Sequence, residues 1–199
     1  MLNMAEQPDD QEVRWMTAMW ADTALHQMVR FEEAMDTYAA ARVDYEFRAA
    51  FHERGDPPEW ASEYAAASQY LTQHQLWNVG AERYFLLHAL AQLRKCLLRL
   101  PSDGLPRVRE DKILRLLRDI DEHWEQGDET RSLTELREWK PDLEPGPGRF
   151  WFNNNHVWVG DTSLTEIYEW IEDVGRSVRE RAGAGGSPIP APEDKLPDR

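Results

Sequence analysis

Arg118, Asp119 and His123 lie within six residues of one another and carry side chains that could do chemistry together. Asp119 and His123 are four positions apart, so on a helix the carboxylate can accept a hydrogen bond from the imidazole and fix its tautomer. The Arg118 guanidinium is suited to gripping a phosphate. An imidazole that exchanges a proton beside such a guanidinium predicts cleavage of a phosphodiester through its neighbouring 2′-hydroxyl, with no metal required.

The segment that carries these residues has the apolar spacing of a helix. Its buried face is predicted from four side chains that lie within about 40° of one another on a helical projection: Ile113, Leu117, Ile120 and Trp124. Arg118, Asp119 and His123 fall outside that stripe. The helix is therefore expected to present them on its polar surface, where an Arg and a His near a helix C-terminus could equally be meeting the helix dipole.

A second pair, Arg83 and His88, has the same spacing. There a tyrosine follows the arginine, and His88 lies within the dense apolar run FLLHAL. Packing in a core is the better explanation for that histidine. The polar residue after Arg118 is what favours the pair at positions 118 and 123.

Arg118, Asp119 and His123 give R-D-x-x-x-H on a predicted bundle helix, which resembles the Rx4–6H signature of the HEPN superfamily. The resemblance covers this motif and the predicted bundle from roughly residue 57 to 126. It implies a metal-independent endoribonuclease, of the kind found in toxin–antitoxin or antiviral systems. Arg118 and His123 would be its catalytic pair at a homodimer groove, with Asp119 as the orienting group. Other members of the superfamily have lost activity and serve as interaction modules.

Charge is distributed unevenly along the chain. The net charge of −14 argues against non-specific coating of nucleic acid. From residue 83 to 118, however, nine basic residues stand against three acidic ones, so Arg107, Arg109 and Arg115 are predicted to bind RNA. From residue 119 to 144, ten acidic residues stand against three basic ones and would repel RNA. A non-catalytic helical module, antitoxin-like or regulatory, that binds a protein partner is therefore the alternative.

Motifs for metals, cofactors and other enzyme classes are missing. No histidine follows a glutamate in the Glu-x-x-His spacing of di-iron bundles, and no His-x-x-x-His pair exists. A metal site would have to assemble from unrelated segments. The phosphate-binding loop, the dinucleotide glycine motif and the G-x-S-x-G elbow are also lacking. We therefore expect neither a metal nor a cofactor.

The single cysteine, Cys96, is predicted to be a small buried hydrophobe in a reducing, cytoplasmic compartment. The first twelve residues have no basic region and no apolar run, and no stretch approaches the roughly 20 apolar residues that span a bilayer. We expect no membrane association.

Hydrophobic periodicity predicts an all-α protein. One very long helix is expected over 12–53, where methionines predict adaptable core packing or, alternatively, a partner-binding groove. Further helices are predicted from about 57 towards 80, over 81–100 as the central core helix, from 106 to 126, and over 132–139. Together they indicate an antiparallel bundle of four to five helices.

The C-terminal part is predicted to decorate this bundle. Aromatic and β-branched residues on both sides of three asparagines indicate a small β-hairpin, and Ser163 with Glu166 forms a capping box that begins a final helix. Three aromatic residues could stack on bases but more often cover a bundle: Trp151, Phe152 and Trp158. We expect a single domain over 12–182, comprising the bundle (12–140) and the hairpin with the terminal helix (149–182). Residues 1–11 and 183–199 are predicted to be flexible tails.

Overall fold

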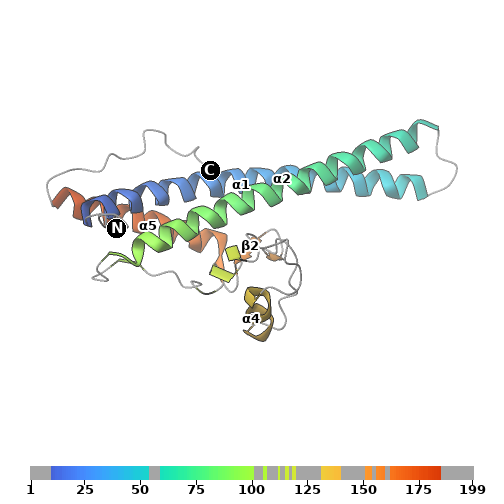
Figure 1. Cartoon of the computed structure of the whole chain (residues 1–199). Helices are drawn as coiled ribbons and strands as arrows, with labels where there is room; N and C mark the ends of the chain where they lie inside the picture. Colours follow the sequence, from blue (N-terminus) through green and yellow to red (C-terminus); the bar gives the residue numbers. More distant parts are fainter. Residues whose placement is uncertain are drawn as a thin grey trace, which may run out of the picture. The chain divides into compact units, whose positions relative to one another are not determined.

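The computed structural model of the chain is mostly helical, as predicted (Figure 1). It describes residues 10–53, 59–100, 105–106, 112, 115–116, 118–119, 131–139, 151–153, 156–159 and 162–184. The predicted tails lie outside these residues, apart from the ends of two helices. The described residues divide into two compact units, one formed by Gln27–Leu86 and the other by the rest of the chain. The boundaries of a single domain remain a prediction.

Two long helices dominate the chain. Helix α1 (Asp10–Glu53) confirms the predicted first helix within two residues. Helix α2 (Glu59–Leu97) is continuous, so the prediction of separate helices on either side of Gly80 is wrong. A glycine inside a helix costs only about 1 kcal/mol relative to alanine. The buried side chains of Val79 and Leu86, which flank Gly80, provide packing that outweighs this cost.

Within the unit Gln27–Leu86, α1 and α2 run antiparallel. Three interhelical contacts define the register. From one contact to the next, the residue number rises on α1 and falls on α2. Arg30 Nη2 donates to Glu82 Oε1 at 2.7 Å, the Thr72 hydroxyl donates to the Ala41 carbonyl at 3.1 Å, and the Ser68 hydroxyl donates to Asp44 at 3.1 Å. Among the side chains of this unit that the structure describes, the buried apolar ones are Met28, Phe31, Ala34, Val79 and Leu86. The two helices form a hairpin with these side chains between them.

The other unit contains the first part of α1, the last part of α2 and helix α5 (Leu164–Ala184). Arg179 on α5 donates to both carboxylate oxygens of Asp22 on α1. The same two helices are close at Gly175, where a Cβ would lie 3.0 Å from Arg179 Nη1 and 3.5 Å from the Ala21 Cβ. The core of this unit is built from three helices and includes Ala18, Ala21, Leu90, Leu93, Ile171 and Val174.

Helix α5 begins at the capping box that the sequence predicts. Glu166 N donates to the Ser163 hydroxyl at 3.2 Å, and Ser163 N donates to the Glu166 carboxylate at 2.9 Å. Three short strands precede the helix in an antiparallel order: β1 (Trp151–Asn153), β2 (His156–Val159) and β3 (Thr162–Ser163). Trp151 pairs with Trp158 across β1 and β2.

The described helices also include α4 (Arg131–Trp139), which confirms the short helix expected there. None of the helices in the described ranges combines the length and the apolar character needed to cross a membrane.

Candidate functional site

The predicted active-site segment is helical wherever it is described, at residues 112, 115, 116, 118 and 119. Leu116 is completely buried and anchors it, although the predicted apolar stripe did not include this position. Just before the segment, the Pro106 carbonyl accepts a hydrogen bond from Trp170 Nε1 of α5 at 3.3 Å. A buried leucine and a tether to α5 therefore position the arginines that follow.

Arg118 and Asp119 contact each other directly. Arg118 Nη1 donates to Asp119 Oδ1 at 3.0 Å, and the two side chains are 26% and 24% exposed. Both are thus partly withdrawn from water, which strengthens the interaction between them. The carboxylate restricts the position of the guanidinium while a quarter of each side chain remains accessible.

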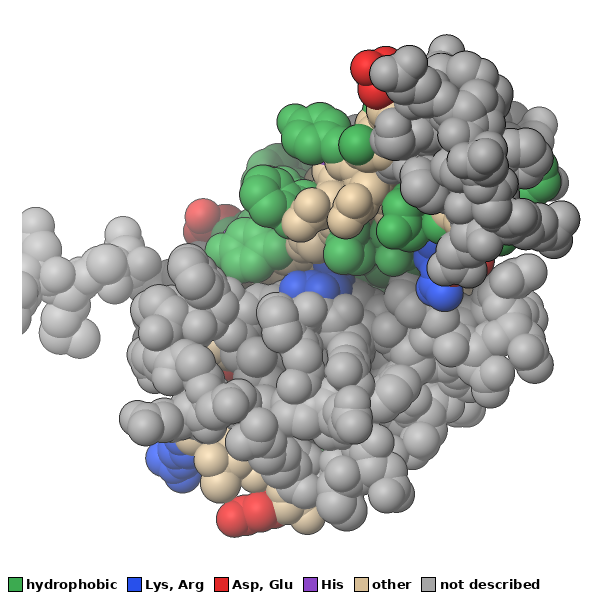
Figure 2. Space-filling view, turned by 90° about the vertical axis from the view of Figure 1, so that its right-hand side faces the viewer, with side chains coloured by type: hydrophobic (Ala, Val, Ile, Leu, Met, Phe, Trp, Pro, Cys, Tyr) green, Lys and Arg blue, Asp and Glu red, His purple; other side chains and the backbone are tan. Residues whose placement is uncertain are grey.

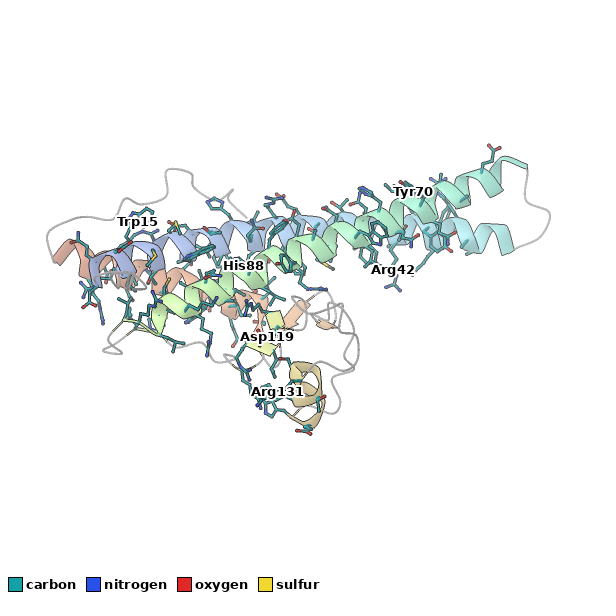
Figure 3. The ribbon with its side chains drawn as sticks, in the orientation of Figure 1. Trp15, Arg42, Tyr70, His88, Asp119 and Arg131 are labelled. Carbon is teal, nitrogen blue, oxygen red and sulfur yellow. The ribbon has the colours of Figure 1, made fainter. Side chains whose placement is uncertain are left out.

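Asp119 is also close to two further groups. The Ser132 hydroxyl of α4 lies 3.5 Å from Asp119 Oδ2, and Arg115 Nη1 lies 3.9 Å from the same oxygen. Figure 3 shows Asp119 beside α4, whose first residue is Arg131. The aspartate therefore lies where the predicted active-site segment meets α4.

Arg115, which is predicted to bind RNA, has carboxylate partners. Its Nη2 donates to Glu135 Oε1 at 2.9 Å, and Lys112 Nζ lies 3.5 Å from the same oxygen. Lys112 Nζ also lies 4.7 Å from the centre of the Trp139 ring. Burial opposes ionisation of Glu135, but the charges and hydrogen bonds of Arg115 and Lys112 outweigh it and lower the pKa of this carboxyl.

Sequence reasoning did not find Lys112, Ser132 or Glu135 as members of this site. Glu135 appeared in it only as one of ten acidic residues between 119 and 144. The contact joins residues 20 positions apart, in two different helical segments, so no local spacing could have revealed it. The available signal was the change of charge sign between adjacent predicted helices, which favours pairing between them.

The remaining predicted site residues lie outside the described part of the chain. These are His123, Arg107 and Arg109, and the side chains of the strand residues Trp151, Phe152 and Trp158. The pairing of Arg118 with His123 is therefore still a prediction. Among the residues that the structure describes, no group of three or more His, Cys, Asp and Glu side chains could hold a metal ion.

His88 belongs to a different environment. Its ring lies 6.1 Å from that of Trp20 at an angle of 66°, an edge-to-face arrangement, and its Nε2 lies 3.3 Å from Gln92 Nε2. This packing favours a structural role for His88, as the sequence indicates. Cys96 is buried as predicted, and burial raises the pKa of its thiol.

One small hollow occurs near the start of α1, lined by Arg14, Leu100, Leu105, Val178 and Arg181. Its volume of about 30 Å³ leaves room for a water molecule or two. It is too small for a nucleotide.

Comparison with known proteins finds no relative. No family model matches the chain, and no curated protein or solved structure is significantly similar to it. The features of the chain that point to a function are the residues from 118 to 123 and the contacts around Arg118 and Asp119.

Proposed function

We propose that this protein is a HEPN-like, metal-independent endoribonuclease, a toxin or antiviral defence component that acts as a homodimer. The observation that carries the proposal is the contact between Arg118 and Asp119 at 3.0 Å, within the sequence R-D-x-x-x-H. It gives the guanidinium a fixed carboxylate partner while leaving part of it exposed. A polar residue that orients the arginine is what the resemblance to the superfamily implies.

The proposed reaction needs a base for the 2′-hydroxyl proton, a proton for the leaving 5′-oxygen, and one charge-stabilising group. The 2′-oxygen of RNA attacks the adjacent phosphorus, its proton passes to the His123 imidazole, and the bond from phosphorus to the 5′-oxygen breaks. The 5′-oxygen takes a proton from water as it leaves, and His123 returns its proton to the solvent, so that the products are a 2′,3′-cyclic phosphate and a 5′-hydroxyl. Arg118 stabilises the negative charge that develops on the phosphoryl oxygens.

RNA binding in this proposal uses Arg107, Arg109 and Arg115. Arg115 has Glu135 as its partner, so a phosphate must compete with that carboxylate. A phosphate that displaces it gains a bidentate guanidinium contact. Glu135 therefore tunes the affinity of the site for RNA.

The contacts of Glu135 with Lys112 and Arg115 support a second candidate, a non-catalytic helical module that binds a protein partner. Glu135 offsets part of the positive charge of Lys112 and Arg115, and the chain as a whole carries −14. Both features disfavour binding of a polyanion. A basic protein partner, as for an antitoxin-like or regulatory protein, suits this charge.

A cleavage assay separates the two candidates. Purified wild-type protein and His123→Ala are incubated with total RNA in the presence of a chelator. His26→Ala is the matched control, because His26 is exposed on α1 and has no role in the proposal. We expect cleavage by the wild type and the control, and its loss in His123→Ala. Cleavage that survives in His123→Ala would remove the assignment, and a wild type that cleaves no RNA but retains a basic partner would favour the second candidate.

The proposal includes the finer architecture. The segment from 106 to 126 completes an antiparallel bundle of four or five helices in which α5 contributes to the core, and the hairpin decorates it. RNA enters a groove between two subunits, where each contributes Arg118 and His123. The expected location is the cytoplasm, where RNA substrates are found.

A further inference from the structure

The outer face of α2 carries aromatic side chains at an interval of seven residues. Tyr70, Trp77 and Tyr84 are 74%, 73% and 39% exposed. Small or polar residues lie next to them on the same face: Ala66, Ala67, Gln73, His74, Gly80 and Ala81. We call these nine residues the α2 seam. A seven-residue repeat of large side chains along one face is the pattern by which helices pair side by side.

The α2 seam is not required by the core of its own unit. Ser68, Thr72 and Val79 lie on the opposite side of α2, where Ser68 and Thr72 donate hydrogen bonds to α1. Figure 3 shows Tyr70 on the side of α2 that is turned away from α1. Exposed hydrophobic side chains of this molecule are also visible in green in Figure 2. Contiguous exposure of large apolar side chains marks an interaction surface.

Charge is absent from this part of α2. From residue 64 to 81 the helix contains no Asp, Glu, Lys or Arg over 18 residues, in a chain of which 30% is charged. A solvated helix surface would normally carry several charges over that length. Depletion of charge together with enrichment in aromatic residues is characteristic of the centre of a protein interface.

Gly80 supplies an independent observation. It lies inside a helix, where glycine is unfavourable by about 1 kcal/mol relative to alanine. A Cβ at this position would meet no heavy atom within 4 Å, so packing within the chain does not require a glycine. The open space beside Gly80 would let a second molecule approach the helix backbone closely.

We propose that the α2 seam is the homodimer interface, with the α2 helices of two copies antiparallel about a two-fold axis at Trp77. The spacing is symmetric about this residue, because Tyr70 precedes it and Tyr84 follows it by the same interval. In this arrangement Trp77 meets its own counterpart, and each Tyr70 lies opposite Tyr84 of the other copy. His74 lies opposite Gly80 of the other copy, where the missing Cβ leaves room for the imidazole.

The charge distribution favours a second copy of the chain as the partner that binds the α2 seam. Two molecules that each carry −14 repel one another over most of their surfaces. The uncharged stretch of α2 is where two copies can approach with the least repulsion. A basic partner would gain nothing from a face without carboxylates.

The area approaches that of a stable interface when neighbouring side chains are included. Six aromatic side chains of about 200 Å² each, at these exposed fractions, bury roughly 740 Å². A stable interface buries about 1,200 Å² or more in total. Leu71 and Phe85, which are both 49% exposed on the flanks of the seam, provide further apolar area. This inference rests on the homodimer in the proposed function but not on the nuclease chemistry.

Sedimentation equilibrium of the full chain tests the interface. We expect the wild type to be a dimer and Trp77→Glu to be a monomer, with a dimer Kd raised at least tenfold. Phe47→Glu is the matched control, since Phe47 is 72% exposed on the other helix of the same unit and should leave the dimer intact. A monomeric wild type at tens of micromolar, or a Trp77→Glu variant as dimeric as the wild type, would overturn the proposal.

Cross-linking keeps the test decisive if Trp77→Glu fails to fold. Asn78 is exposed next to the proposed axis, so Asn78→Cys should give a covalent dimer with a short bis-maleimide. Ala40→Cys, at an exposed position on α1, should give none. Equal cross-linking of both variants, or none with Asn78→Cys, would overturn the interface. RNA cleavage measured separately on the same proteins shows whether the nuclease proposal stands or fails on its own.

Discussion

Arg118 donates a hydrogen bond from Nη1 to Oδ1 of Asp119 at 3.0 Å, so two consecutive residues of the chain hold each other in place. Asp119 also has Ser132 and Arg115 as neighbours, at 3.5 Å and 3.9 Å. The aspartate thereby links the two arginines to α4. This relationship gives Asp119 a positioning role that mutation can separate from catalysis.

Replacing Asp119 should lower the rate of RNA cleavage more than the affinity for RNA. A charge-assisted hydrogen bond contributes about 1.5–3 kcal/mol, so Asp119→Ala should reduce kcat by roughly 10- to 100-fold with a small change in KM. Asp119→Asn retains an acceptor and should retain more activity. Glu138→Ala removes an exposed carboxylate from α4 and serves as the control. Equal kcat values for Asp119→Ala and Glu138→Ala would exclude the positioning role.

Glu135→Gln should strengthen RNA binding. The substitution removes the negative charge beside Arg115 and Lys112, so both cations become more available to phosphate. We expect the Kd for a short single-stranded RNA to fall severalfold at low salt, with a steeper salt dependence. Fluorescence anisotropy measures both quantities. An unchanged Kd would show that these cations do not contact RNA.

Acid should weaken the attachment of α4. Arg115 and Lys112 lower the pKa of Glu135 against the effect of burial, so the contribution of this contact to stability is fully present at neutral pH. This contribution is lost as the pH falls from the ordinary pKa range of a glutamate through the lowered pKa of Glu135. Hydrogen exchange of the α4 amides, corrected for the intrinsic rate, should show faster exchange in acid. In Glu135→Gln the corrected exchange of α4 should depend less on pH, and an identical dependence in both proteins would contradict this account.

Asp22→Asn should destabilise the protein. The variant replaces the carboxylate that accepts both hydrogen bonds from Arg179, and the two side chains are only 23% and 21% exposed. Loss of a partly buried charged partner costs about 1–3 kcal/mol. Urea unfolding followed by circular dichroism measures this change. Asp36→Asn, at an exposed position on α1, should change stability by less than about 0.5 kcal/mol. A similar effect of both substitutions would mean that the α1–α5 pair contributes nothing specific.

Cys96 should react slowly with thiol reagents. Burial raises the pKa of its thiol, and the thiolate that reacts with such reagents is scarce at neutral pH. We expect alkylation of the native protein to be at least tenfold slower than that of the urea-unfolded protein. Rapid alkylation without unfolding would contradict the burial of Cys96 in the helical core.

Local patterns predicted much of the helical structure. The absence of Gly and Pro between residues 12 and 53 predicted α1, and the capping residues Ser163 and Glu166 predicted the start of α5. The apolar stripe predicted within 81–100 runs through Phe85, Leu86, Ala89, Leu90, Leu93, Leu97 and Leu100. Of these, Leu86, Leu90 and Leu93 are fully buried core residues, as predicted. These features depend on interactions within one turn of a helix, which a sequence shows directly.

Features that depend on tertiary contacts were missed. Phe85 belongs to the same stripe but is 49% exposed, and Gly80 does not end a helix, because packing on α1 decides both outcomes. The contact between Arg115 and Glu135 joins two helical segments, so its existence depends on how the chain folds back. The spacing of the aromatic residues in the α2 seam indicates a helix, but it does not reveal whether they face the core or the solvent. Only the structure shows that Tyr70 and Trp77 are exposed.

The chemistry of the RNA ends tests the central claim most directly. An oligoribonucleotide is incubated with the wild type and with His123→Ala in the presence of a chelator, and the products are identified by mass spectrometry. The proposed mechanism predicts fragments that end in a 2′,3′-cyclic phosphate for the wild type and intact RNA for His123→Ala. Intact RNA with the wild type, or the same cyclic ends from both proteins, would contradict it.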